Sequence, residues 1–188
     1  MGLLTRLFGK KKLKNAKIVL LGASGAGKTT LIKFLETGKT VEEDPNTTLG
    51  IDIRKKPIKI DGWSLSTIDI GGQELYQKTF WNLGLSQSDA VVYLIDSTLR
   101  PTYNSDNFEM SVFSFEYMLE LLPPNKPILI LVNKQDLVEY NPLSVEEATT
   151  HYSFHKLIGR SMNILPSSAK YGEGINTALS WMVQKLEE

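Results

Sequence analysis

The stretch GASGAGKT at residues 22–29 constrains the fold of this chain more than any other. It fits the pattern G-x-x-x-x-G-K-[ST], follows an apolar run at residues 17–22 and opens residues 27–36, where leucine and isoleucine recur at helical spacing. Its glycines let backbone N–H groups point inward, and the first turn of a helix adds positive partial charge. The stretch therefore predicts a phosphate-binding loop between a buried strand and a helix.

Two side chains at the end of this loop carry most of its expected chemistry. Lys28 is placed to neutralise terminal phosphates, and Thr29 to offer its hydroxyl to Mg²⁺. A glycine-rich turn that binds nothing is the alternative, because short motifs recur by chance. The residues of this stretch predicted to bind the nucleotide are Gly22, Ala23, Ser24, Gly25, Ala26, Gly27, Lys28, Thr29 and Thr30.

The rest of the chain predicts one α/β domain. Near-continuous apolar strands alternate with helices, which indicates a mostly parallel sheet with helices on both faces. Six strands are predicted, at residues 17–22, 51–60, 63–70, 90–95, 127–132 and 162–165. Helices are predicted at residues 27–36, 104–122, 145–158 and 175–188. Asp61-Gly62 favours a tight hairpin turn, and residues 37–50 are predicted to be a mobile loop.

Composition excludes several classes of protein. The longest aliphatic run, residues 128–132, is too short to cross a bilayer. The chain has no cysteine, which excludes a disulfide framework, a thiolate metal site and cysteine catalysis. Positive charge gathers on one arm and not on a folded face, so nucleic acid is not an expected partner.

Three further motifs each follow a predicted strand. In DIGGQ (69–73), Asp69 can reach the Mg²⁺ shell and the Gly72 N–H can meet a γ-phosphate. In NKQD (133–136), Asp136 can accept both the ring N–H and the exocyclic amine of guanine, a donor pair that adenine lacks. SAK (168–170) is placed to donate a backbone N–H to the guanine carbonyl. Together the motifs predict a guanine-nucleotide site at the carboxyl edge of the sheet.

The motifs GASGAGKTT, TTLG, DIGGQE, DSTLR, NKQDL and SAK together resemble those of the small GTPases, and within them the Arf and Arf-like family. The resemblance covers almost the whole chain. It implies a P-loop GTPase domain over residues 16–188 that binds GTP or GDP with Mg²⁺, preceded by a short amphipathic helix in an arm at residues 1–15. Ser24 departs from the aspartate usual in Arf proteins, and Ile51 and Ile68 replace aromatic residues, so familiar Arf partners are not assumed.

The resemblance also assigns roles residue by residue. Thr48 would join Mg²⁺ and the γ-phosphate, with Thr47 as the alternative if the register slips by one residue. Gln73 would orient the attacking water, so the expected catalytic set is Gln73, Lys28 and Thr48. The expected metal site is Thr29, Thr48 and, through water, Asp69. Nucleotide contacts are also expected from Thr48, Gly72, Asn133, Lys134, Asp136, Ser168, Ala169 and Lys170.

The arginine content bears on the expected rate of hydrolysis. An arginine finger contributes about 10³ to 10⁵ in rate, and none stands just before Thr48, where one could act in cis. We therefore expect slow intrinsic hydrolysis that is accelerated by a separate activating protein. The resemblance also implies a monomer that works with an exchange factor and effectors. Asp96 and Arg100, within DSTLR, are interpreted as a pair that fixes a loop.

The N-terminal arm, MGLLTRLFGKKKLK, has a pattern of its own. Residues 1–17 hold six basic residues and no acidic one, which leaves 15 basic and 21 acidic residues in the remainder. One side of a helical wheel gathers the large apolar side chains of Leu3, Leu4, Leu7 and Phe8. This predicts a membrane-binding helix, with a solubilising tail as the alternative. Gly2 is the acylation point in myristoylated relatives, but Arg6 breaks the pattern M-G-x-x-x-[ST].

Three functions fit these motifs. The leading hypothesis is a GTP-controlled switch that docks its N-terminal helix on the cytosolic face of a membrane and recruits effectors in a traffic-like role. In the Arf family the hairpin that corresponds to residues 51–70 slides on GTP binding and displaces this helix. The second hypothesis is a soluble GTPase whose arm is a tail or packs permanently on the core. The third is a P-loop kinase or ATPase, against which Asp136 argues.

Overall fold

The computed structural model describes residues 13–42, 48–53 and 57–188. The predicted membrane-binding residues Leu3, Leu4, Leu7 and Phe8 lie outside the described residues, as does Thr47. Within the described part, no helix combines the length and the hydropathy that a bilayer span requires.

A sheet of seven described strands forms the centre of the molecule, in the order β2-β4-β1-β5-β6-β7, with β3 also paired to β4. β4, β1, β5, β6 and β7 run parallel, whereas β2 and β3 are antiparallel to β4. The strands are β1 (Lys14–Leu21), β2 (Ile51–Ile53), β3 (Ile58–Ile60), β4 (Trp63–Ile70), β5 (Ala90–Asp96), β6 (Ile128–Asn133) and β7 (Met162–Pro166). The predicted mostly parallel sheet is confirmed.

The difference between six predicted and seven described strands arises at the hairpin. The predicted strand at residues 51–60 is described as β2 and β3, with residues 54–56 between them outside the described part. The turn itself is as predicted, because Asp61 and Gly62 have φ values of 44° and 82°. β1 begins at Lys14, so the last residues assigned to the N-terminal arm belong to the sheet.

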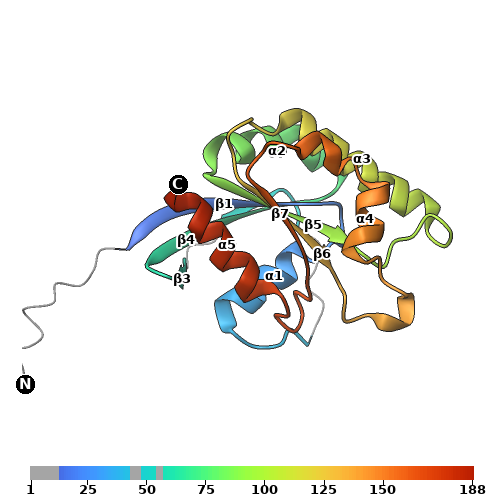
Figure 1. The fold of residues 1–188 in the computed structure, drawn as a ribbon, viewed down its shortest axis with the longest axis horizontal. Helices are drawn as coiled ribbons and strands as arrows, with labels where there is room; N and C mark the ends of the chain where they lie inside the picture. The colour runs from blue at the N-terminus through green and yellow to red at the C-terminus, as the bar shows by residue number, and fades with distance from the viewer. Residues whose placement is uncertain (1–12, 43–47, 54–56) are drawn as a thin grey trace, which may run out of the picture.

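Helices cover both faces of the sheet (Figure 1). The five α-helices described are α1 (Lys28–Thr37), α2 (Glu74–Gln87), α3 (Ser105–Leu121), α4 (Val145–His151) and α5 (Ile175–Glu187). Two 3-10 turns are also described, η2 (Val138–Tyr140) between β6 and α4, and η3 (Phe154–Leu157) between α4 and β7. α2, α3 and α4 share one hydrophobic core with the sheet, and α1 and α5 share the other. This is the predicted fold class.

Helix α2 is absent from the predicted elements because half of its buried face is not apolar. The buried residues are Gln77, Trp81, Gly84 and Leu85, which are spaced as one helical face. Only Trp81 and Leu85 of these are large apolar residues, so the hydropathy pattern does not predict the helix. A Cβ atom on Gly84 would lie 2.4 Å from Cδ1 of Ile70, so glycine lets α2 approach the sheet closely.

The helix predicted at residues 145–158 is broken in the structure. α4 ends at His151, and η3 follows after a short gap. Tyr152 and Phe154 are both buried in the core beside Phe115, at 2% and 6% exposure. Two residues that are two positions apart lie on opposite sides of an α-helix, so the chain must leave the helix to bury both rings.

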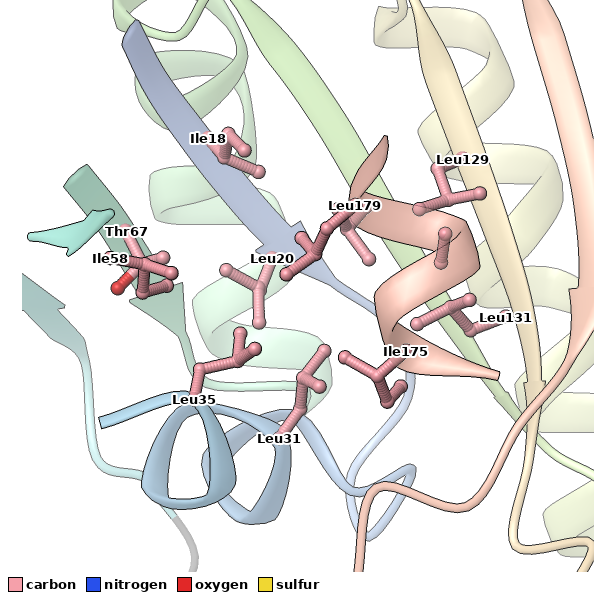
Figure 2. A pocket seen from close by; sticks show the side chains of 12 residues that line it. Ile18, Leu20, Leu31, Leu35, Ile58, Thr67, Leu129, Leu131, Ile175 and Leu179 are labelled. Atoms are coloured by element: carbon pink, nitrogen blue, oxygen red, sulfur yellow. The ribbon is translucent and has the colours of Figure 1, made fainter. Parts of the chain in front are cut away.

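Figure 2 shows a small cavity between the sheet and the helices α1 and α5. Apolar side chains from β1, α1 and α5 point toward it, among them Leu20, Leu31 and Ile175. Thr67 is the one polar residue among its described lining, and no charged group reaches it. An almost wholly apolar lining offers phosphates too few hydrogen-bond donors, so the nucleotide site lies elsewhere.

Candidate functional site

The four sequence motifs meet at the carboxyl edge of the parallel strands. The phosphate loop follows β1, DIGGQ ends β4 and enters α2, NKQD leaves β6, and SAK leaves β7. Parallel strands bring their carboxyl ends to one edge, which is where ligands bind in open α/β sheets. The motifs therefore form one site because of the topology, although the first and last are about 140 residues apart.

Lys28 is a buried cation in the phosphate loop. It is 6% exposed, and its Nζ donates hydrogen bonds to the carbonyls of Gly22 and Ala23, at 2.8 and 2.9 Å. Burial lowers the pKa of Lys28 from 10.5 to about 8, against the opposing charge of Asp69. A buried ammonium held by neutral carbonyls lacks full charge compensation. The loop is therefore built for an anionic ligand.

Three side chains converge where the loop meets β4. The Oγ1 atoms of Thr29 and Thr48 lie 2.8 Å apart, and both lie close to Oδ2 of Asp69, at 2.8 and 3.1 Å. Asp69 is fully buried, and its Oδ1 has no hydrogen-bond partner among the described residues. The structure thus assembles the predicted metal site from three separate segments of the chain.

The doubled glycine in DIGGQ allows the backbone to pass close to both neighbouring motifs. A Cβ on Gly71 would lie 2.6 Å from the Thr48 carbonyl oxygen and from the ring of Tyr76. A Cβ on Gly72 would lie 2.5 Å or less from backbone atoms of Ala23. Gly71 also donates its N–H to the Gly50 carbonyl, at 2.9 Å. Any side chain here would push the predicted switch segments apart.

An open pocket of about 130 Å³ lies beside the phosphate loop, with both polar and apolar lining. It is lined by Gly27, Thr30, Asn133, Lys134, Asp136, Leu137, Ala169 and Lys170. Seven of these eight were predicted as nucleotide contacts, all but Leu137, and Asp136 among them forms no ion pair with the described residues. The pocket has the position and the acceptor expected of a guanine site.

Asn133 joins three parts of this site. Its Nδ2 donates to the Ala26 carbonyl in the phosphate loop, at 2.9 Å. Its Oδ1 accepts from the Ala169 N–H at 2.8 Å and from the Ser167 hydroxyl at 3.2 Å. The side chain is 1% exposed. All of these bonds go to protein atoms, so Asn133 connects the phosphate loop to the segment that follows β7.

Lys134 and Asp96 form a pair that the sequence did not indicate. The Lys134 Nζ lies 2.7 Å from Oδ2 of Asp96, and the Asp96 Oδ1 accepts from Thr98. Arg100 instead binds Glu147, at 3.0 Å. The interpretation of Asp96 and Arg100 as a pair was therefore wrong, because Asp96 binds Thr98 of its own loop and Lys134 after β6, whereas Arg100 reaches Glu147 of α4.

Gln73 begins α2 as its N-cap residue and is exposed. It lines a second open pocket with Ala23, Ser24 and Gly72, which shares no lining residue with the base pocket. Gln77, one helical turn later, is buried and bonded, and no sequence motif marked it. A glutamine at a position spaced for the buried face of a helix is the signal that could have found it.

Asn133→Ala is expected to lower both the stability of the protein and its affinity for GDP. The change leaves the Ala26 carbonyl and the Ala169 N–H without their buried partner, which costs about 1 to 3 kcal/mol for each group. Thermal unfolding should shift to lower temperature, and GDP affinity measured by fluorescence titration should fall. Asn176→Ala, on the exposed face of α5, is the matched control and should change neither. Unaltered stability of Asn133→Ala would contradict the bonding role.

Comparisons with known proteins identify the family. The sequence model of the ADP-ribosylation factor family matches residues 2–186. The chain is 35% identical over 191 aligned positions to ADP-ribosylation factor-like protein 3 of Chlamydomonas reinhardtii, with 100% of both sequences covered. It is 30% identical to ADP-ribosylation factor-like protein 1 of Saccharomyces cerevisiae, over 97% of this chain and 93% of that protein.

A solved structure also has the same fold. It is described as the Arl6 BBS3 small GTPase from Trypanosoma brucei with bound nucleotide analogue GppNp. The TM-score is 0.74 at 20% identity, with 93% of this chain and 98% of that chain covered. The chain therefore belongs to the ADP-ribosylation factor family of small GTPases, which are guanine-nucleotide-binding switches that hydrolyse GTP.

Proposed function

We propose that this GTPase is a monomeric, slowly hydrolysing, Mg²⁺-dependent switch that binds the cytosolic face of a membrane through its N-terminal helix when it carries GTP, and there recruits effectors. The single observation that carries the switch is the cluster of Thr29, Thr48 and Asp69. Thr48 comes from the segment expected to respond to the nucleotide, and it meets fixed residues of the phosphate loop and β4.

The cluster fits Mg²⁺ by its chemistry. All of its donors are oxygens, which this hard cation prefers. Octahedral ligands at 2.0 to 2.1 Å from the ion lie about 2.9 Å apart, close to the 2.8 Å between the two threonine hydroxyls. Both hydroxyls can donate to Asp69 and keep their lone pairs free for the ion. When bound, the ion would neutralise charge on the β- and γ-phosphates.

Slow hydrolysis is supported by the positions of the described arginines. Arg100 binds Glu147 of α4 and the carbonyl of Asn141. Arg160 donates to the carbonyls of Leu122 and Pro123, after α3. Arg6 and Arg54 lie outside the described residues. No described arginine therefore stands at the phosphate loop, and we expect one to be supplied by a separate activating protein.

Membrane binding rests on the N-terminal arm. Four large apolar side chains on one helical face contribute up to about 1.5 to 3 kcal/mol each when buried, and lysines near an anionic bilayer add about 1 kcal/mol apiece. The arm enters the sheet at Lys14, whose Nζ lies 3.2 Å from Glu187 at the end of α5 (Figure 1). A soluble GTPase, with the arm as a tail or packed on the core, remains the second candidate.

Liposome co-sedimentation tests the membrane proposal. Protein loaded with a non-hydrolysable GTP analogue should bind anionic vesicles about tenfold more than protein loaded with GDP, since the switch needs a differential affinity of that order. Removal of residues 1–13 should abolish the difference. Leu7→Asp should also abolish it, whereas Thr5→Asp adds the same charge to the polar face and should weaken binding less. Equal binding in both nucleotide states would remove the switch, and no binding in either would favour the soluble GTPase.

A further inference from the structure

Gln77 is a buried polar residue that the site described above does not use. It lies on α2, is 2% exposed and uses both hydrogens of its side-chain amide. Its Nε2 donates to the Gly72 carbonyl at 2.7 Å and to the Ser114 hydroxyl of α3 at 2.8 Å. A buried glutamine with both donors satisfied by different elements holds those elements in register.

The direction of these bonds is fixed by Ser114. The Ser114 hydroxyl donates its proton to the Met110 carbonyl, at 2.8 Å, within α3. It can therefore only accept from Gln77, which requires the amide nitrogen of Gln77 to face both Ser114 and Gly72. The side-chain amide has one orientation that satisfies both partners, so α3 defines where the Gly72 carbonyl lies.

Gln77 holds the two successive peptide groups on either side of Gln73. Its side chain binds the Gly72 carbonyl, and its backbone N–H donates to the Gln73 carbonyl, at 3.0 Å. On the opposite side Gly72 packs against the backbone of Gly22 and Ala23, with no space for a Cβ atom. The peptide that carries Gln73 is thus clamped between the phosphate loop and α3.

We propose that Gln77, anchored by Ser114, is a positioning residue for GTP hydrolysis. It orients the Gly72–Gln73 peptide so that the Gln73 side chain extends into the pocket beside Ala23 and Ser24. The inference rests on the proposed role of Gln73 in orienting the attacking water. Gln77 lines the same pocket, but both hydrogens of its Nε2 are already donated to Gly72 and Ser114, so its role is to position Gln73.

Single-turnover hydrolysis of GTP tests this positioning role. Gln77→Met keeps the length of the side chain without its amide, and Ser114→Ala removes the anchor while the bond to Gly72 remains available. Both variants should lower the hydrolysis rate, Gln77→Met by about 10- to 100-fold, as expected when a reacting geometry is displaced by an ångström or less. GDP affinity should stay within about threefold, because neither residue lines the base pocket. The double variant should be no slower than Gln77→Met, because the two residues act as one unit.

Thr79→Ala is the matched control. Thr79 lies on the same helix, is exposed and bonds the Leu75 carbonyl, so its loss should leave the rate unchanged. A lower melting temperature for Gln77→Met and Ser114→Ala with a wild-type hydrolysis rate would overturn the inference, since it would show a structural role alone.

Gln73→Leu, measured in parallel, distinguishes failure of the positioning role of Gln77 from failure of the proposed role of Gln73. If Gln73→Leu is slow and Gln77→Met is as fast as the wild type, the positioning inference fails and the proposed role of Gln73 stands. If Gln73→Leu itself keeps the wild-type rate, the proposed role of Gln73 fails, and the inference with it. Slow hydrolysis by both Gln73→Leu and Gln77→Met, with GDP affinity retained, supports the proposal.

Discussion

Lys28→Met is expected to reduce GDP affinity by about 10²- to 10⁴-fold. The wild-type ammonium is buried beside two neutral carbonyls, and burial lowers its pKa to about 8, so a phosphate would relieve an existing charge penalty as well as accept hydrogen bonds. Charged hydrogen bonds contribute about 1.5 to 3 kcal/mol each, and two of them account for this loss. Isothermal titration with GDP and excess Mg²⁺ measures it.

The stability of nucleotide-free Lys28→Met should differ little from that of the wild type, because two effects oppose each other. The Gly22 and Ala23 carbonyls lose a donor, but a buried and poorly compensated charge is also removed. Lys33→Met makes the same change on the same helix, away from the loop, and should bind GDP as the wild type does. Wild-type affinity in Lys28→Met would mean that the loop does not hold phosphates.

The parts of this molecule that could be predicted are those in which local chemistry determines geometry. The turn at Asp61 and Gly62 requires positive φ values, and the sequence supplies the two residue types that tolerate them. The phosphate loop needs glycine at Gly27, where φ is 97°, a conformation that other residues rarely adopt. The mostly parallel arrangement of the sheet follows from apolar strands alternating with helices.

The remaining features depend on contacts between distant segments, which no local pattern encodes. Helix α2 buries a glutamine and a glycine because α3 supplies a hydroxyl and the sheet supplies close contacts. Asp96 binds Lys134 because β5 and β6 end side by side, 38 positions apart in sequence. Hydropathy and spacing describe one segment at a time, so polar residues with tertiary partners are the ones that sequence analysis missed or paired wrongly.

Asp136→Asn is expected to change which base the protein binds. The Asp136 carboxylate lies in the lining of the base pocket, where it can accept from both the ring N–H and the exocyclic amine of guanine. An asparagine amide supplies one acceptor and places a donor against one of these groups. Loss of one charge-assisted bond and mispairing of the other predict a decrease in GDP affinity of about 10²- to 10⁴-fold.

A comparison of nucleoside diphosphates shows whether the base is the cause. Xanthosine diphosphate has a carbonyl where guanine has its amine, so Asp136→Asn should prefer it to GDP, and the wild type should prefer GDP. Asp106→Asn, on the exposed first turn of α3, removes the same charge away from the pocket and should keep the wild-type order. If ADP bound the wild type as tightly as GDP, Asp136 would not select guanine. Because Asn133 already fixes the pocket to the phosphate loop, a change in base preference without a change in stability would locate the effect at the carboxylate itself.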